Sequence, residues 1–459
     1  MLLQFVLENF RSFHSEEILN MIPAKSRIHD RHVMRSESKG RKVRALPLAI
    51  LYGANASGKS NLVDAIAFAQ ALILHGTRSE QPTGTVPFRL GAKTAEAPSR
   101  FEFVLKHDGV LYTYGFAITN HEVKEEWLFA VFLKQEVRLF ERLTEAGKAL
   151  MKFGAKLAPT KREKSRLEFV AAGTRPNQLF LTEANERNVD LLKPLMSWFR
   201  DHLTVVRPDA AYQPLVLRAQ TDVQFKEFLS QFLGIADTGI QGIDLDAEEL
   251  DFSRHFPAMS EPERKSLLDE LGRDPDHYLF LRAGKTVWGL RQEPGQAAQV
   301  LRLRTRHTTS DGRQVLFDTR DESDGTHRMM HLAPALLDLQ CAENVYVIDE
   351  LDRSLHPHLC RLYVDAFLRG VSEKENCGQM ILTTHETSLL DLDLLRRDEI
   401  WFVEKNKQGA SHLTSLAEFK YKVRADLKIA RGYLNGRFGA IPFIGDARKL
   451  LSLSGHPCS

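Results

Sequence analysis

The hydrophobic positions in the first part of the chain predict a strand, a polar stretch and then a strand–loop–helix unit. Residues 2–7 are typical of a strand, and residues 48–52 form a continuous apolar run, as in a buried strand. Small residues and glycines follow, and apolar positions then recur at helical spacing over residues 61–72. Residues 1–85 are therefore expected to form the first piece of an α/β core.

The middle of the chain changes pattern twice. Residues 100–105 and 110–118 are apolar runs joined across Asp108-Gly109, which is a strong hairpin signal, and an antiparallel meander continues to residue 143. The segments predicted from the pattern are a β-rich subdomain at 86–177, a helical insertion at 178–275 and strands that return to the core at 276–320.

In the last part, short apolar runs alternate with helical patterns. The runs cover residues 344–348, 379–384 and 399–403, and the helical patterns cover residues 359–371 and 389–395. This alternation indicates βαβ units and a parallel sheet. Residues 321–459 are thus expected to complete the core that residues 1–85 begin. The predicted fold class is α/β, with an antiparallel β subdomain and a helical insertion between the two halves of the core.

The composition favours a soluble globular protein. The 459 residues are 43% hydrophobic and 27% charged, with a formal net charge of +2. No apolar run reaches the roughly 18 residues of a membrane span, and the N-terminal segment lacks the features of a signal peptide. The four cysteines have no metal-ligand spacing and suit a reducing compartment; they are Cys341, Cys360, Cys377 and Cys458. We expect a cytoplasmic protein without a membrane partner.

Basic residues gather in two places. Residues 25–44 contain eight Lys and Arg, and Arg302, Arg304 and Arg306 alternate along a predicted strand. Because the net charge is close to zero, a solvated loop and the exposed face of a sheet are the favoured interpretation. The alternative is a nucleic-acid surface, in which the three arginines would follow a row of phosphates.

Residues 53–60 match the pattern G-x-x-x-x-G-K-[ST] at every fixed position. The glycines let backbone N–H groups turn toward phosphate oxygens, and the following helix adds the positive end of its dipole. Lys59 is expected at the β- and γ-phosphates and the Ser60 hydroxyl at Mg²⁺. A similar string at 284–286 has Leu279 in place of the first glycine, and its apolar flanks predict a hairpin instead.

Acidic residues and a histidine end two of the later strands. Asp349 and Glu350 follow the apolar run 345–348, at the sheet edge where open α/β folds bind ligands. Asp349 is expected to hold Mg²⁺, and Glu350 to polarise the attacking water. His385 ends the next strand and is interpreted as a γ-phosphate sensor. The alternative for His385 is an imidazole that caps a helix or faces solvent.

Residues 322–326 open an amphipathic helix that runs to residue 339. Ser323 and Gly325 at its N-terminus describe a second anion site. Because the core already has a phosphate loop, this second site is expected to contact the nucleotide of another molecule, which requires a homo-oligomer of at least two copies. The alternative is a simple capped helix.

Together, these motifs resemble the heads of ABC/SMC-type ATPases, and most of all the bacterial AAA-type ATPases of the RloA/AbiL and OLD group in phage-defence systems. The resemblance rests on residues 53–60, 323–326, 349–350, 352–357 and 385, with further agreement at 6–13 and 433–442. It implies a P-loop NTPase fold of ABC/SMC-head type. It also implies ATP and Mg²⁺ as cofactors, ATP hydrolysis and a nucleotide held between protomers.

The resemblance assigns roles to individual residues as well. It implies that Ser323 and Gly325 contact ATP bound to a partner copy, although this chain has Glu-Ser-Asp-Gly-Thr where transporters have Leu-Ser-Gly-Gly-Gln. Asp352 would be the acid of the D-loop, and Arg11 and Asn9 would lie near the adenine or ribose.

The resemblance also bears on the glutamine loop and on two histidines near Asp352. Gln178 is the candidate for the family's glutamine loop. His356 and His358 are assigned to the D-loop segment rather than to a metal cluster. The predicted catalytic residues are Lys59, Glu350 and His385, the metal ligands are Ser60 and Asp349, and the nucleotide-binding residues are Gly53, Ala54, Asn55, Ala56, Ser57, Gly58, Lys59, Ser60, Asn61, Arg11, Ser323, Gly325 and Asp352.

Three functions are compatible with these features. The first is a phage-defence sensor ATPase that controls a separate effector protein, such as a Toprim-type nuclease, because related OLD proteins carry that nuclease after the ATPase. The second is a RecF/SMC-like ATPase that binds DNA in repair or clamping. The third is a nucleotide-dependent scaffold with little turnover.

Overall fold

The computed structural model describes residues 1–38, 40–91, 94–132, 135–212, 215–272, 278–283, 286–292, 294–373, 378–419, 429–436 and 438–440. The chain forms two compact units. Unit 1 comprises residues 1–206, 343–350 and 371–459, and unit 2 comprises residues 207–342 and 351–370. Cys377, Cys458, residues 284–285, where a turn was expected, and the last residues of the 433–442 motif lie outside the described residues.

A seven-stranded antiparallel sheet forms one layer of unit 1, in the order β10-β9-β8-β7-β6-β1-β2. Its strands are β1 (Leu2–Glu8), β2 (Glu17–Asn20), β6 (Ser99–His107), β7 (Val110–Ile118), β8 (Val123–Phe132), β9 (Gln135–Glu145) and β10 (Lys148–Phe153). Asp108 and Gly109 both have positive φ, which matches the twist of a two-residue hairpin. The predicted hairpin is therefore confirmed, with His107 opposite Val110.

The second sheet of unit 1 is mostly parallel, in the order β11-β17-β18-β5-β19-β20. Its strands are β5 (Leu48–Tyr52), β11 (Leu203–Val206), β17 (Val345–Ile348), β18 (Gln379–Thr383), β19 (Ile400–Lys405) and β20 (Ser411–Ser415). Only β20 runs antiparallel to its neighbour. Because β5 pairs with both β18 and β19, the first and last parts of the chain form one sheet. This confirms the predicted α/β class.

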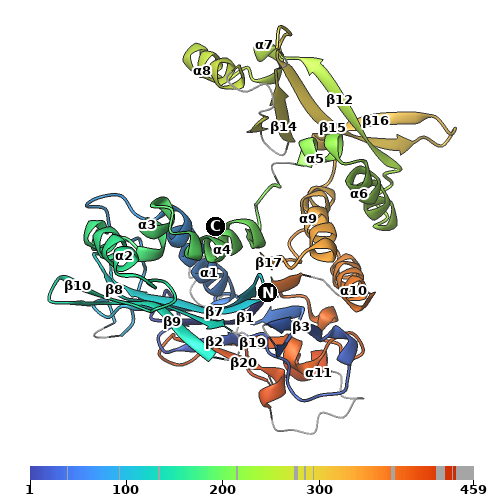
Figure 1. Ribbon diagram of the computed structural model, residues 1–459. Helices are drawn as coiled ribbons and strands as arrows, with labels where there is room; N and C mark the ends of the chain where they lie inside the picture. Colours follow the sequence, from blue (N-terminus) through green and yellow to red (C-terminus); the bar gives the residue numbers. More distant parts are fainter. Residues whose placement is uncertain are drawn as a thin grey trace, which may run out of the picture. The chain divides into compact units, whose positions relative to one another are not determined.

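Helices and sheets of unit 1 share one hydrophobic core. Its helices are α1 (Lys59–His75), α2 (Lys161–Gly173), α3 (Phe180–Glu186), α4 (Lys193–Ser197) and α11 (Ile429–Leu434). Leu62, Ile66 and Ile73 of α1 are buried in the core together with Ala49 and Leu51 from one face of β5. Helices α2, α3 and α4 lie on one side of the seven-stranded sheet (Figure 1). Burial of both β5 and α1 fixes the loop between them.

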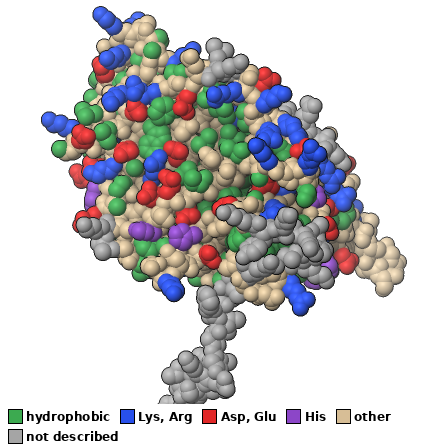
Figure 2. Space-filling view, turned by 90° about the horizontal axis from the view of Figure 1, so that it is seen from below, with side chains coloured by type: hydrophobic (Ala, Val, Ile, Leu, Met, Phe, Trp, Pro, Cys, Tyr) green, Lys and Arg blue, Asp and Glu red, His purple; other side chains and the backbone are tan. Residues whose placement is uncertain are grey.

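A small hairpin completes unit 1. Strands β3 (Met34–Ser38) and β4 (Arg41–Ala45) pair with each other in a separate two-stranded sheet. Most of the basic residues at 25–44 are exposed, and Figure 2 shows Lys and Arg side chains gathered toward the side where Figure 1 places β3.

Unit 2 combines a second antiparallel sheet with helices. Its strands are β12 (Gly242–Glu249), β13 (Leu279–Ala283), β14 (Thr286–Arg291), β15 (Gln299–Thr308) and β16 (Gln314–Asp318). Its helices are α5 (Leu215–Thr221), α6 (Val223–Ile235), α7 (Phe252–His255), α8 (Glu261–Leu271), α9 (Asp324–Cys341) and most of α10 (Pro357–Glu373). Strands β13 and β14 pair as the hairpin expected around residues 284–286.

One element prediction was wrong: the helix expected at 389–395 is missing, and the described chain has a 3-10 turn at Thr387–Leu389 followed by an irregular turn. The Asp391 side chain accepts a hydrogen bond from the Asp393 amide, a local bond that competes with helix formation. The segment at 178–275 is mainly helical, as expected, but it also contains β11, which pairs with β17, and β12, which pairs with β15. Among the described residues, no helix is both long and apolar enough to cross a bilayer.

Candidate nucleotide-binding site

The loop at residues 53–58 connects β5 to α1 and can exist only with glycine at two positions. A Cβ at Gly53 would collide with the carbonyl oxygen of Val403. Gly58, which precedes α1, has a φ of 118°, a conformation that side chains disfavour. The loop therefore turns tightly at the carboxyl end of β5 and presents backbone N–H groups at the N-terminus of α1, as a phosphate site requires.

Lys59 folds back over this loop. Its side chain is 5% exposed, and Nζ donates hydrogen bonds to the carbonyl oxygens of Gly53 at 2.8 Å and Ala54 at 3.2 Å. The ammonium group thus lies within the loop, where a cation can reach phosphate oxygens gathered by the backbone N–H groups.

Three polar side chains outside the loop hold it in place through hydrogen bonds that were not predicted from the sequence. Ser411 Oγ lies 2.5 Å from the carbonyl oxygen of Ser57 and 2.8 Å from Ser12 Oγ. Asn61, at the start of α1, donates to Ser12 Oγ at 2.7 Å. Ser411 is on β20 and Ser12 follows β1, so two distant segments hold the loop in place.

A hydroxyl and a carboxylate face each other beside the loop. Ser60 Oγ donates to Asp349 Oδ1 at 3.2 Å, and Asp349 is 4% exposed at the end of β17. A hydroxyl and a single carboxylate fit Mg²⁺, which prefers oxygen ligands and keeps several sites for water and phosphate oxygens. Among the described residues, no group of three His, Cys, Asp or Glu could hold a metal, so His356 and His358 do not form such a cluster.

Glu350 and His385 lie at the same edge of the sheet as Asp349. Glu350 follows Asp349 directly and has a positive φ of 49°, which is uncommon for a residue other than glycine. His385 is exposed and lies two residues beyond the end of β18. Since β18 lies between β17 and β5, the sheet brings the ends of these three strands together.

The residues expected near the adenine or ribose make contacts within unit 1. Arg11 forms an ion pair with Asp64 of α1 at 2.7 Å and keeps 41% of its side chain exposed. Asn9 is buried and holds the segment at residues 88–98, since it accepts from the Phe88 amide and donates to the carbonyl oxygen of Thr94.

Gln178 cannot be the glutamine loop, and this candidate was wrong. Gln178 Oε1 accepts a hydrogen bond from the Thr77 amide at 2.8 Å, just after the C-terminal end of α1. The phosphate loop is at the other end of this 17-residue helix, about 25 Å away at 1.5 Å per residue.

Three other predicted residues belong to unit 2. Ser323 is the N-cap of α9, and its hydroxyl accepts a hydrogen bond from the Thr326 amide at 3.1 Å. Gly325 lies against the turn that contains Asp352, because a Cβ there would be 2.7 Å from the carbonyl oxygen of Ser354. Ser323, Gly325 and the Asp352 turn thus form one compact group.

Polar residues line a cavity next to this group. A cavity of about 270 Å³ at the N-terminal end of α9 is lined by Asp209, Asp324, His327, Arg328, His331 and Arg353, among others. The cavity was not predicted from the sequence, although His327, Arg328 and His331 follow one another at helical spacing along α9.

The arginine row on β15 does not offer unpaired positive charge. Arg302 pairs with Asp246, Glu248 and Asp318, and Arg306 pairs with Asp244. Arg304 lies 3.4 Å from Asp246 as well. The acids of the neighbouring strand β12 therefore balance the row, and the phosphate-tracking interpretation loses its basis.

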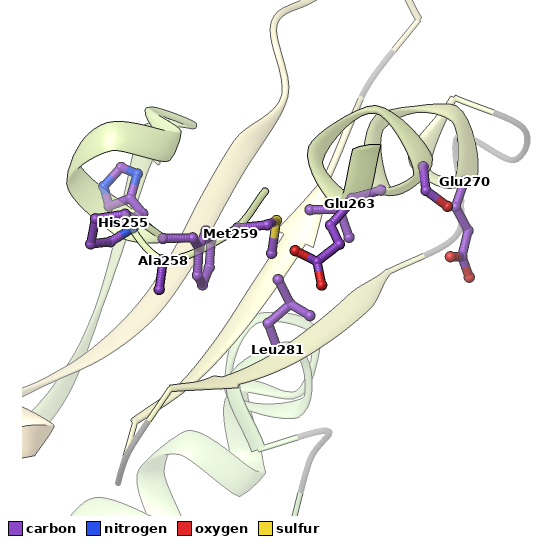
Figure 3. Close-up of a pocket in the computed structure, with 10 residues that line it drawn as sticks. His255, Ala258, Met259, Glu263, Glu270 and Leu281 are labelled. Atoms are coloured by element: carbon purple, nitrogen blue, oxygen red, sulfur yellow. The ribbon is translucent and has the colours of Figure 1, made fainter. Parts of the chain in front are cut away.

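A larger cavity in unit 2 has a mainly apolar wall. It has a volume of about 590 Å³ and lies between α7, α8 and β13, with Phe256, Met259, Leu267 and Leu281 in its wall (Figure 3). Glu263 is part of this wall, but it also closes the capping box of α8 by accepting from the Ser260 amide. Among the described residues that line it, none is a Lys or Arg that could bind phosphate.

Comparisons with known proteins place the chain in a family. No curated protein matches. Two solved structures are similar over most of their length: an SMC head domain from Thermotoga maritima, at 13% identity and a TM-score of 0.36, and an SmcHead bound to the C-winged helix domain of ScpA, at 13% identity and a TM-score of 0.37. Each comparison covers 90% of this chain, and 98% and 97% of the other chains. Residues 48–391 match the family model described as "AAA domain, putative AbiEii toxin, Type IV TA system", and the chain belongs to this family of AAA domains.

Proposed function

We propose that this protein binds ATP with Mg²⁺ and hydrolyses it. The observation that carries the proposal is the approach of Ser60 to Asp349 beside the Lys59 loop, at the carboxyl edge of a parallel sheet. Membership of the AAA family supports the same conclusion.

Each residue has a defined part in this function. Backbone N–H groups of residues 53–58 and the Lys59 ammonium bind the β- and γ-phosphates. The oxygens of Ser60 and Asp349 would hold Mg²⁺, which neutralises phosphate charge when bound. Glu350 accepts the proton of the attacking water, and the His385 imidazole orients that water or contacts the γ-phosphate.

We also propose that Ser323 and Gly325 contact the nucleotide of a second copy of the chain. The 18-residue helix α9 begins at this point, so its dipole favours an anion there. Arg328 and Arg353 line the adjoining cavity together with Asp209 and Asp324, so cations for phosphate lie next to the helix end. Asp352 packs in the same group and would report the occupancy of one site to the other.

The wider role that we propose is regulation of a separate effector protein in an anti-phage system of the RloA/AbiL/OLD type. The family description supports a two-protein arrangement, because it names a type IV toxin–antitoxin system. The balanced charge of the arginine row gives no comparable support to DNA binding. Phage plating on cells that carry the protein with its neighbouring reading frame tests this role, and loss of protection in a Glu350→Gln strain is expected.

Steady-state hydrolysis and nucleotide binding test the ATPase function directly. Lys59→Ala is expected to weaken ATP binding by about tenfold or more, because a charge-assisted bond to phosphate is lost. Glu350→Gln is expected to keep ATP affinity while turnover falls about 100-fold or more. Lys164→Ala, an exposed lysine on α2, is the matched control and should behave as wild type. Wild-type turnover in Glu350→Gln would exclude Glu350 as the base.

A further inference from the structure

One hydroxyl group, that of Thr383, connects the two acidic residues of the site. Thr383 Oγ1 donates to Asp349 Oδ1 at 2.5 Å and accepts a hydrogen bond from the backbone amide of Glu350 at 2.8 Å. Thr383 is 0% exposed at the end of β18. Because a hydroxyl has one proton, accepting from the Glu350 amide leaves that proton for Asp349 and fixes the direction of both bonds.

The two bonds act on different properties of the site. The bond to Asp349 fixes the rotation of a carboxylate that also contacts Ser60, and these two residues are the expected Mg²⁺ ligands. The bond to the Glu350 amide holds a residue whose φ of 49° is uncommon without glycine. The backbone of Glu350 determines where its side chain begins, so the same hydroxyl sets the position of the expected general base.

We propose that Thr383 is a positioning residue that couples Mg²⁺ binding at Asp349 to the placement of Glu350. This inference rests on the ATPase function proposed above. His385 is two residues further along the chain, so Thr383 also links both acids to the segment that carries the γ-phosphate sensor. A buried threonine that only fills space on β18 would have none of these effects on chemistry.

The test compares full-length Thr383→Val and Thr383→Ser with wild type. Valine keeps the shape and removes the hydroxyl, whereas serine keeps the hydroxyl. Removal of a hydrogen bond to a metal-binding side chain typically costs about 10- to 100-fold in metal affinity or activity. We expect Thr383→Val to lower kcat by about tenfold or more, with a much smaller change in KM. Thr383→Ser should stay within about threefold of wild type.

A second readout does not depend on turnover. Binding of a fluorescent ATP analogue is titrated against Mg²⁺, and Thr383→Val should need several-fold more Mg²⁺ for half-maximal binding. Thr144→Val is the matched control, because Thr144 is also a buried strand residue whose hydroxyl donates a single bond, to the Val123 carbonyl at 2.7 Å. It should change neither readout.

The outcomes separate this inference from the proposed function. If Thr383→Val has wild-type kcat and Mg²⁺ dependence, the inference fails while the ATPase function stands. A defect in Thr383→Ser together with wild-type behaviour of Thr383→Val would assign Thr383 a packing role, because only serine removes the methyl group. Should the valine variant not fold, Thr383→Ala and Thr383→Ser give the same comparison, since both lack the methyl group. A wild-type protein that binds no ATP overturns both proposals.

Discussion

Gly325 is a residue whose missing side chain joins two motifs of unit 2. Glycine is needed at this position because of the space available and not because of an unusual backbone angle. A Cβ would lie only 2.7 Å from the carbonyl oxygen of Ser354. A Cβ at residue 325 would therefore push the helix N-terminus and the Asp352 turn apart.

Gly325→Ala should therefore destabilise the protein by about 1–3 kcal/mol, as overpacking usually does. The Lys59 loop is in unit 1, so the affinity of a single chain for ATP should change little. Thermal unfolding and nucleotide titration measure these effects. Gly173→Ala is the control: nothing lies near a Cβ at this helical position, and a gain of about 0.4–1 kcal/mol is expected. Equal stability changes in the two variants would contradict the argument.

Among the site residues, those that belong to a contiguous motif could be predicted from the sequence. Residues 53–60 form a contiguous motif, so the loop could be recognised directly. Thr383 and Ser411 could not be, because their partners Asp349 and Ser57 are 34 and 354 residues away. The arginine row was interpreted without its counter-charges for the same reason: Asp244 and Asp246 come from a strand in a segment expected to be helical.

At the level of elements, one buried carboxylate on β8 holds the start of α3. Glu126 Oε2 accepts from the Phe180 amide at 2.6 Å, and Oε1 accepts from the Leu181 amide at 2.9 Å. Glu126 is fully buried, and Tyr114 also donates to it at 3.0 Å. The side chain thus satisfies helix N–H groups that have no partner within the helix.

Glu126→Gln should cost about 1–3 kcal/mol, because the amide would point N–H groups at N–H donors. Burial raises the pKa of Glu126 above its ordinary 4.5. The folded chain therefore holds this proton to a higher pH than the unfolded chain does, and the stabilisation is greatest at low pH. The stability difference between wild type and Glu126→Gln should narrow as the pH rises above the ordinary pKa of 4.5.

Chemical denaturation across this pH range measures the effect. Glu125→Gln, the exposed neighbour on the same strand, should leave stability unchanged within about 0.5 kcal/mol. A difference between wild type and Glu126→Gln that widens as pH rises would contradict the assigned direction of the pKa shift.

Element prediction succeeded where an uninterrupted apolar run or a clear turn signal marked the strands. Strands β5, β17, β18 and β19 were recognised from apolar runs, and β6 and β7 from their turn. Strand β11 was missed because Thr204 interrupts its short apolar run and the strand directly follows the helical turn at Trp198–His202. Its pairing with β17 is decided by tertiary contacts that a local pattern does not contain.

For the whole molecule, the proposed sharing of nucleotide between copies makes a prediction about mixtures. Lys59→Ala and Ser323→Ala should each hydrolyse little ATP alone. When the two proteins are mixed, half of randomly formed dimers contain both, and one of their two sites has neither defect, so about a quarter of wild-type activity should return. ATP turnover against mixing ratio measures this recovery.

The control for this experiment is Ser260→Ala. Ser260 is the N-cap of α8, and its replacement should cost about 1 kcal/mol of stability, as at Ser323, without affecting turnover. A mixture no more active than the average of its components would contradict a site shared between protomers.

The pairing of β5 also determines when the parallel sheet can form during synthesis of the chain. Neighbours β18 and β19 are encoded in the last quarter of the chain, and the Leu2 amide bonds to Gln379, 377 residues later. During synthesis on the ribosome, residues 48–52 therefore have no strand to pair with on either side until β18 and β19 have been made. Contacts this distant in sequence slow folding, and the nascent chain is exposed to aggregation or to chaperones for most of its translation.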